Sequence, residues 1–433
     1  LCFWNLSKSA CKIRRFLLPC SGVVPIVNGG RFLTMKPLSS RFGPEYTAAL
    51  GAYTAIGAAV SGYASALLLA RGCTNREIGF TLGAGTVAAL VLQPLAADLT
   101  DRSRRISVLH VLLALGGVMA AALLALGFGA ERGALLAAVY VVLLCANQMA
   151  QPFSNSLCLE LALRGARINF GAARGTGALC YAVFAAALGL LVRRVGTDAV
   201  PFAGLAVTAA FLAVTALIFV QCRRSGPDFS APAAPGEHSR GIGAFLRDNP
   251  RFLLLMAGVM LAYLPHMVYS NFLVRVVLRA GGGEGDLGLL GGWCALTELP
   301  AMFLFSRLLR RFRSGTLLCF SALMFACKQL AICLAFTMPA LFAAQLLEGL
   351  SYAVFIPATV RYMEESVPRA DAVKGQTLIT AMLSLASVAA SLLGGVLLDT
   401  VGLQTTLFSG VFVALAGFAL LIPAVRSKRR AKA

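Results

Sequence analysis

The stretch LTDRSRRISVLHVLLALGGVMAAALLALGF, residues 99–128, decides the fold of this 433-residue chain. Six of its first seven residues are polar or charged, and residues 107–128 then run without a single Asp, Glu, Lys or Arg. About 20 apolar residues are enough for a helix to cross the hydrocarbon core of a bilayer. The stretch therefore predicts a membrane-spanning helix that begins directly after a basic loop.

The composition extends this prediction to the rest of the chain. The sequence is 58% hydrophobic and only 13% charged, and its mean hydropathy is +0.80. Soluble domains carry about 25% charged residues, so lipid must be part of the solvent here. Only helices and closed barrels satisfy their backbone groups in lipid, and these apolar runs are too long for barrel strands of ~10 residues. We expect an all-α integral membrane protein.

Apolar runs of this kind predict about twelve transmembrane helices. The predicted spans are 46–70, 79–97, 107–128, 134–158, 168–192, 199–221, 252–275, 286–306, 314–335, 338–360, 374–398 and 403–424. An even number of spans puts both termini on the same side of the membrane. We expect a multi-pass protein of the plasma (inner) membrane.

The charge pattern predicts which side the termini occupy. The formal net charge is +20, and most Lys and Arg fall in one alternate set of loops and in the tail. The other loops hold only Arg71, Arg76, Arg132, Arg193, Arg194 and Arg279. Basic loops stay in the cytoplasm, so we expect both termini there. The same pattern explains the net charge without a nucleic-acid partner, which we do not expect.

The chain divides at residues 222–251, which are rich in Pro, Ala and Gly and read as a linker. The predicted parts are an N-terminal segment 1–45, a six-helix bundle 46–221, a cytoplasmic linker 222–251, a second six-helix bundle 252–425 and a basic cytoplasmic tail 426–433. Residues 1–34 lack the span pattern, and we expect translation to start at Met35. A signal peptide built around Arg14 and Arg15 is the alternative.

Motifs typical of enzymes and metal sites are absent from the sequence. The twelve Cys form no C-x-x-C pair, and with only three His we expect neither a zinc site nor a cofactor. No phosphate-binding Gly-x-x-x-x-Gly-Lys-Ser/Thr motif is present, which excludes an ATP-driven pump. We expect a protein that is not an enzyme, and nothing in the sequence indicates an oligomer.

The two halves of the chain repeat each other. The basic run that ends at Arg105, after the second span, is echoed by the run that ends at Arg311, after the eighth. Gly171 opens the fifth predicted span as Gly375 opens the eleventh. Parallel repeats around a central cavity are a common plan of secondary transporters.

On these residues the chain resembles the major facilitator superfamily over residues 43–425. Leu99, Asp101, Arg102 and Arg105 match the family's loop signature between spans two and three, whereas its glycines are replaced by Ala97 and Arg104. The resemblance implies a fold of two six-helix bundles and a conformational latch formed by Asp101, Arg102 and Arg105. The alternative is that this loop only sets the topology.

A narrower resemblance is to the lactose-permease and phenylpropionate-permease branch of proton symporters. Residues 170–177, FGAARGTG, look like the start of that branch's fifth span, which implies that Arg174 grips substrate. The resemblance also implies that Tyr181 stacks on substrate and that Lys328 and Glu348 are functional. Ser156 stands where that branch has a substrate-binding carboxylate, which argues against a lactose-like sugar.

Three charges lie near the middle of predicted spans, namely Glu298, Lys328 and Glu348. Charges inside a membrane are expensive and are therefore usually paired or functional. Substrate that competes for Lys328 would free a carboxylate to bind a proton, which predicts proton coupling through Glu348 or Glu298. A static structural ion pair is the alternative. Arg174 lies closer to its span end, where snorkelling to the surface is also possible.

Further candidate site residues are polar groups on span faces. Asn147 and Gln151 lie one turn apart on the fourth span, where they either line a cavity or bind a neighbouring helix. Tyr263 and His266 lie one turn apart on the seventh span near Pro265, and a packing role for the His is the alternative.

We therefore predict a secondary active transporter, a proton symporter for a small polar metabolite such as a sugar, nucleoside or aromatic acid. The proton gradient would supply the energy. A drug or metabolite exporter of the same fold is the alternative. An intramembrane enzyme or lipid-handling protein is a third possibility.

Overall fold

The computed structural model describes residues 27–28, 31–32, 42–102, 106–129, 133–163, 166, 168–224, 247, 250–367 and 372–426. Within these residues two short strands, β1 (Val27–Asn28) and β2 (Arg31–Phe32), pair antiparallel. Nearly all of the remaining described residues are helical, as the long apolar runs predict.

The first half of the described chain consists of α2 (Phe42–Gly57), a π-helical turn η1 (Ala58–Gly62), α3 (Ala64–Ala70), α4 (Asn75–Arg102), α5 (Val108–Phe128), α6 (Ala134–Leu163), α7 (Phe170–Val195) and α8 (Ala199–Arg224). The second half consists of α10 (Pro250–Asn271), α11 (Leu273–Arg279), α12 (Glu284–Arg311), α13 (Ser314–Leu334), α14 (Met338–Ala344), a 3₁₀ turn η2 (Gln345–Glu348), α15 (Tyr352–Ser366), α16 (Ala372–Thr400) and α17 (Gly402–Arg426).

Among the described residues, eleven helices are long and apolar enough to cross a membrane, and a twelfth span results if the bent pair α2–η1 and α3 counts as one. The two parts of that pair meet at an angle of 41°. The predicted spans thus have the correct number and order. The structure differs from the prediction in three spans that are interrupted rather than continuous.

The interruptions fall at Tyr63 in the first span, at Phe272 in the seventh and at residues 345–351 in the tenth. In the tenth span, Gly349 packs so closely against the backbone carbonyl of Thr297 that a side chain would collide with it. The carbonyl of Leu347 accepts from the backbone N–H groups of Leu350 and Ser351 at 3.1 and 2.9 Å and from the Ser351 hydroxyl at 2.8 Å, so it stays satisfied at the break. Glycine is common in membrane spans, so its presence alone did not predict these breaks.

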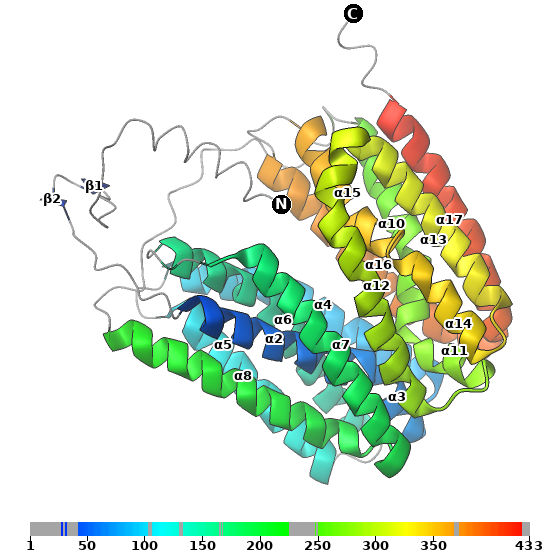
Figure 1. Ribbon diagram of the computed structural model, residues 1–433. Coiled ribbons are helices and arrows are strands. Elements are labelled where there is room, and N and C mark those ends of the chain that lie inside the picture. The colour runs from blue at the N-terminus through cyan, green and yellow to red at the C-terminus, as the bar shows by residue number, and fades with distance from the viewer. Residues whose placement is uncertain are drawn as a thin grey trace, which may run out of the picture.

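Two bundles of helices lie side by side (Figure 1). In the N-terminal bundle α2 packs on α7 and α8, and α5 packs on α6 and α8; in the C-terminal bundle α10 packs on α16 and α17, and α13 packs on α15 and α17. The bundles meet through α7 with α12 and through α4 with α16. We call the face at which α4, α6 and α8 end the basic face, and the other end of the molecule the opposite face.

The sequence repeat is also a structural repeat. At the end of the first span, the guanidinium of Arg71 donates to the carbonyl of Leu126 at 2.7 Å, at the end of α5. At the end of the seventh span, Arg279 donates to the carbonyl of Ile332 at 2.7 Å, at the end of α13. Equivalent arginines therefore fasten equivalent helix ends in both bundles.

The apolar core extends through both bundles. One large cluster of buried residues lies mainly in the N-terminal bundle, around Ile56 and Phe211, and reaches Val268 and Phe272 of the C-terminal bundle. A second lies within the C-terminal bundle around Phe355. A further cluster joins the two bundles, from Tyr63 and Leu188 to Leu290. Movement of one bundle against the other must therefore break these shared apolar contacts.

Close contacts join the bundles at the opposite face. In the first seam, Gly189 of α7 lies against Gly285 and Gly288 of α12, and in the second, Gly79 of α4 lies against Ser391 of α16. A Cβ on any of these glycines would collide with the backbone of the other helix. Small residues let helices approach closely, so both seams are tight.

Polar contacts fasten each seam. Arg193 forms an ion pair with Asp286 across the first seam. Across the second, the carboxylate of Asp399 accepts from the side chain of Asn75 at 2.6 Å and from the backbone N–H of Arg76 at 2.8 Å. Arg275 also donates to the side chain of Asn75, at 2.7 Å. The opposite face is therefore closed in this structure.

Candidate functional site

A cavity of about 500 Å³ lies between the two bundles. Residues of α2, η1, α6 and α7 line it on one side, and residues of α10, α12, α13, η2 and α15 line it on the other. Of the predicted site residues, the lining includes Gln151, Arg174, Tyr181, His266, Glu298, Lys328 and Glu348. The interrupted first and tenth spans both border this cavity, as discontinuous helices do in many transporter sites.

The most buried charges of the cavity are Lys328 and Glu348. Lys328 on α13 forms an ion pair with Glu348 on η2, and the two residues are only 2% and 4% exposed. Glu348 ends the 3₁₀ turn that interrupts the tenth span, and its carboxylate contacts Lys328 on α13. Leaving either charge alone at this depth would be strongly unfavourable, so the two depend on each other.

A second layer of polar groups surrounds the ammonium of Lys328. Its nitrogen lies 5.0 Å from the centre of the Tyr269 ring, within the range of a cation–π interaction. Buried Gln345 donates to the hydroxyl of Tyr269, and the thiol of Cys294 lies 3.3 Å from the Gln345 carbonyl oxygen. Lys328 therefore contacts both the carboxylate of Glu348 and the ring of Tyr269.

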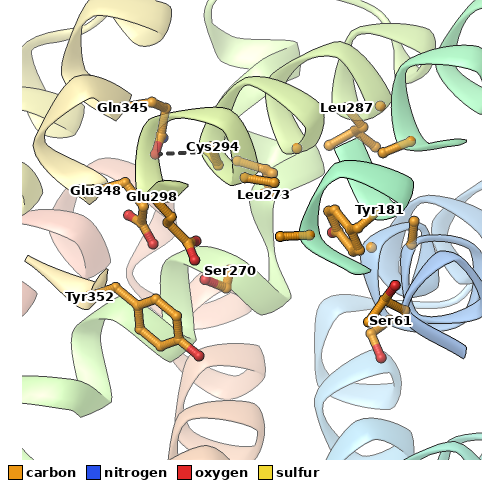
Figure 2. Close-up of a pocket in the computed structure, with 18 of the residues that line it drawn as sticks. Ser61, Tyr181, Ser270, Leu273, Leu287, Cys294, Glu298, Gln345, Glu348 and Tyr352 are labelled. Atoms are coloured by element: carbon orange, nitrogen blue, oxygen red, sulfur yellow. Dashed lines mark hydrogen bonds between the residues drawn. The ribbon is translucent and has the colours of Figure 1, made fainter. Parts of the chain in front are cut away.

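Glu298 on α12 is a second carboxylate in the same cavity. Figure 2 shows Glu298 and Glu348 projecting into the cavity from the C-terminal bundle, with Tyr181 and Ser61 across from them. Within the described residues no cation lies within ion-pair distance of Glu298. The cavity thus contains one paired carboxylate and one unpaired carboxylate.

The N-terminal side of the cavity carries mainly uncharged polar groups and one cation. Arg174 is exposed at the end of the cavity nearer the basic face, and Gln151, Asn155 and Tyr181 also line this side. The arrangement offers hydrogen bonds and aromatic surface on the N-terminal side and opposite charges on the C-terminal side.

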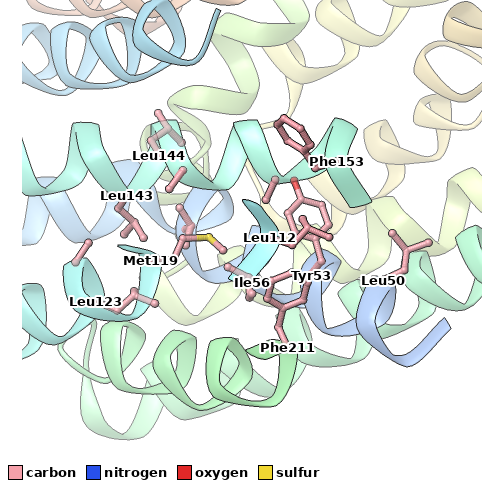
Figure 3. Packing of buried hydrophobic residues seen from close by; sticks show 14 of the residues in the cluster. Leu50, Tyr53, Ile56, Leu112, Met119, Leu123, Leu143, Leu144, Phe153 and Phe211 are labelled. Carbon is pink, nitrogen blue, oxygen red and sulfur yellow. The ribbon is translucent and has the colours of Figure 1, made fainter. Parts of the chain in front are cut away.

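Tight packing holds this side in position (Figure 3). Tyr53 packs with Ile56 and Phe211 in the apolar core, and its hydroxyl donates to the carbonyl of Asn147 at 2.9 Å. The side-chain nitrogen of Asn147 lies 3.4 Å from the hydroxyl of Ser61. Asn147 is buried between helices and does not line the cavity, so it supports the wall that Tyr53 and Ser61 form.

Tyr263 also lies behind the cavity wall. Its ring packs with those of Phe325, Tyr352 and Phe355 in an aromatic cluster. His266 joins this cluster, stacked on Tyr352 at 5.2 Å, and its Nε2 lies 3.9 Å from a carboxylate oxygen of Glu348. Its Nδ1 is buried without a protein partner in the described part of the chain.

The predicted latch falls largely outside the described residues. Arg105 lies in an undescribed segment, and for Asp101 and Arg102 only the helical backbone at the end of α4 is described. Their latch role stays a prediction.

Several residues of the cavity were not predicted. Gln345 and Tyr352 line it, and no neighbouring polar residue at helical spacing distinguished them in the sequence. Ser61 was missed because the π-helical turn that directs it inward was not predicted. Among the described residues no group of His, Cys, Asp and Glu side chains could hold a metal ion.

This fold, with its cavity between two repeated bundles of helices, defines a membrane transporter. A family model described as the MFS_1 like family matches residues 50–409, and the chain belongs to this family. The chain is 26% identical to a maltose permease of Geobacillus stearothermophilus over 296 residues, which cover 68% of this chain and 72% of the permease.

Solved structures show the same fold. The nucleoside transporter NupG matches with a TM-score of 0.74 and 13% identity, over 90% of this chain and all of that one (100%). A bacterial homologue of the iron transporter ferroportin in an inward-facing state matches with a TM-score of 0.68 and 15% identity, over 89% of this chain and 99% of that chain. The predicted all-α fold and the resemblance to the major facilitator superfamily are confirmed, and the protein is a transporter rather than an enzyme.

Proposed function

We propose that this transporter is a proton-coupled symporter of a small polar metabolite that works by alternating access. The observation that carries the proposal is the pairing of Lys328 with Glu348 beside the unpaired Glu298 in one cavity between the bundles. Intramembrane charges that face a cavity are typical of ion and proton pathways.

Glu298 is the proposed proton carrier. Glu298 is half-buried in the cavity wall, where an ionised carboxylate without a contacting cation is less stable than in water, and binding a proton removes that penalty. Glu348 already has Lys328 as its partner, so it has less to gain from a proton. Of the two carboxylates predicted as proton carriers, we therefore favour Glu298. The Lys328–Glu348 ion pair keeps its charges while Glu298 gains and loses the proton.

The substrate would bridge the two sides of the cavity. Arg174 and Gln151 offer hydrogen bonds from the N-terminal bundle, and Tyr181 offers a ring for stacking. With Glu298 ionised the four charges that line the cavity sum to zero, and a proton on Glu298 leaves a net charge of +1. The cavity therefore suits a neutral polar molecule such as a sugar or nucleoside, or a weak monoanion such as an aromatic acid, better than a strong anion. The names of two similar proteins, a maltose permease and a nucleoside transporter, support the same classes.

The orientation follows from the loop charges. With the basic face in the cytoplasm of a plasma membrane, both termini are cytoplasmic and the closed seams are external. The structure would then represent a state open to the inside, ready to release substrate. Alternation would require the seams at Gly189 and Gly79 to part while the basic face closes. One chain contains the whole cavity, so a monomer suffices.

Transport by Glu298→Gln in vesicles tests the proposal. We expect the variant to lose substrate accumulation driven by a proton gradient and to retain exchange of labelled substrate, because exchange needs no net proton transfer. A panel of maltose, nucleosides and an aromatic acid supplies the substrate. Glu284→Gln, in the first turn of the same helix and outside the cavity, is the matched control. Gradient-driven accumulation by Glu298→Gln at the control's level would refute the proposal.

A further inference from the structure

A second cavity, of about 340 Å³, lies on the flank of the second seam. Its walls come from both bundles, with Phe80 on α4 and Leu392 and Val396 on α16. These three side chains are 67%, 40% and 41% exposed. In a helix bundle within a membrane, exposed apolar side chains on a flank contact lipid, so we call this cavity the lipid-facing groove.

Charged side chains lie at one end of the groove, in the first turn of α4. Within the described residues no acceptor is recorded for the guanidinium of Arg76, whose backbone N–H is used by Asp399. The neighbouring carboxylate of Glu77 accepts from the backbone N–H and the hydroxyl of Thr74, at 2.8 and 3.0 Å. Asp399 is likewise engaged by Asn75 and by the Arg76 backbone. The nearby carboxylates are therefore occupied, whereas the guanidinium is available.

The position of Arg76 along α4 determines which part of a lipid its guanidinium can contact. α4 begins at Asn75, so Arg76 lies where the span enters the membrane, at the depth of lipid headgroups. A guanidinium binds a phosphate through two parallel hydrogen bonds, and apolar side chains one or more turns further along the helix lie at the depth of acyl chains. The groove combines both features in the order in which a phospholipid presents them.

We propose that the lipid-facing groove binds one diacyl phospholipid, with its phosphodiester on Arg76 and one acyl chain against Phe80, Leu392 and Val396. The recognised chemistry is the phosphodiester together with the chain, which phosphatidylglycerol and phosphatidylethanolamine share.

The bound lipid would select one conformational state. Phe80 belongs to the N-terminal bundle and Val396 to the C-terminal bundle. The two walls of the groove therefore lie together only when the second seam is closed. A ligand that binds one state better than another shifts the population toward that state. The lipid would therefore hold the opposite face closed.

Native mass spectrometry of the delipidated full-length protein tests this inference. The probes are phosphatidylglycerol, phosphatidylethanolamine and diacylglycerol, which lacks the phosphate. We expect one phospholipid of either kind to be retained and diacylglycerol to be lost. Arg76→Ala should weaken retention by ~10-fold or more, because a charged hydrogen-bonding partner is removed. Arg194→Ala, an exposed arginine at the end of α7, should retain lipid as the unaltered protein does.

Val396→Trp provides an independent arm because it fills the groove and leaves Arg76 in place. It should also release the lipid, and its thermal unfolding shows whether it has folded. Equal phospholipid retention by the unaltered protein, Arg76→Ala and folded Val396→Trp would overturn the proposal. Retention of diacylglycerol as strong as that of the phospholipids would overturn it as well.

Discussion

The two bundles share a fold but differ in what they contribute to the cavity. The C-terminal bundle supplies Glu298, Lys328, Glu348 and His266, all of them buried or facing the cavity. The N-terminal bundle supplies a single cation, Arg174, among amide and aromatic side chains. Repetition of the fold without repetition of the charges indicates a division of labour.

The difference assigns separate tasks to the two bundles. The charges of the C-terminal bundle depend on one another, so a change in one alters the others. The polar groups of the N-terminal bundle are held by a packed core and can contact substrate without disturbing that network. Changes in the C-terminal bundle should therefore affect energy coupling, and changes in the N-terminal bundle should affect substrate affinity.

Removal of Lys328 should have the largest effect. Lys328→Ala leaves Glu348 buried without its partner, which should destabilise the fold by about 3–5 kcal/mol and abolish accumulation. Adding Glu348→Gln removes the unpaired charge and should restore much of the stability but not the transport. Thermal unfolding in detergent measures the first effect. If Lys328→Ala and the double variant were equally stable, an unpaired Glu348 would not be the cause of the destabilisation.

Replacement of Arg174 should affect substrate affinity rather than proton coupling. A hydrogen bond to a charged group contributes about 1.5–3 kcal/mol, so Arg174→Gln should raise KM by ~10-fold to ~100-fold. The number of protons moved per substrate should stay the same. Initial rates and proton fluxes in proteoliposomes measure both quantities, with Arg194→Gln as control. A changed proton stoichiometry would contradict the division of labour.

The seams between the bundles should respond more moderately. Asp399→Asn weakens the contacts of the second seam and should shift the population toward an open opposite face by ~10-fold, the loss of about 1.4 kcal/mol. The readout is the labelling rate of Leu287→Cys, near the closed end of the cavity, in a background without other cysteines. Asp198→Asn is the control, because Asp198 is 85% exposed and lies 3.8 Å from Arg71 outside both seams. Equal labelling of the two variants would mean that the second seam does not hold the face closed.

The smallest effect is expected at Tyr269. Tyr269→Phe removes the hydroxyl that accepts from Gln345 but keeps the ring beside Lys328. The free energy of unfolding should fall by about 0.5–1.5 kcal/mol, and accumulation should fall only slightly. Tyr269→Leu also removes the ring and should lower accumulation further. Gradient-driven uptake compares the variants, and equal activity of the Phe and Leu variants would exclude a role for the ring.

Much of the fold was predictable from the sequence because lipid imposes simple rules. Long apolar runs such as residues 107–128 predicted the spans, and the repeat of basic runs predicted two bundles. The breaks at Tyr63, Phe272 and residues 345–351 were not predictable, because they depend on how neighbouring helices satisfy the freed backbone groups.

The site was predictable in part for the same reason. Mid-span charges are rare, so Glu298, Lys328 and Glu348 were identified as candidates by depth alone. Depth does not specify helix rotation, however, and only the structure pairs Lys328 with Glu348. Asn147, predicted either to line the cavity or to bind a neighbouring helix, contacts Tyr53 and Ser61 of the first span. Tyr263, a candidate site residue, lies behind the cavity wall.

Proton uptake on substrate binding tests the central proposal most directly. Purified protein in weakly buffered detergent solution, with a pH indicator, is mixed with a substrate identified in the vesicle screen. We predict uptake of protons by the unaltered protein and by Glu284→Gln, and none by Glu298→Gln even though it still binds substrate. Undiminished proton uptake by Glu298→Gln would contradict the assignment of Glu298 as the proton carrier.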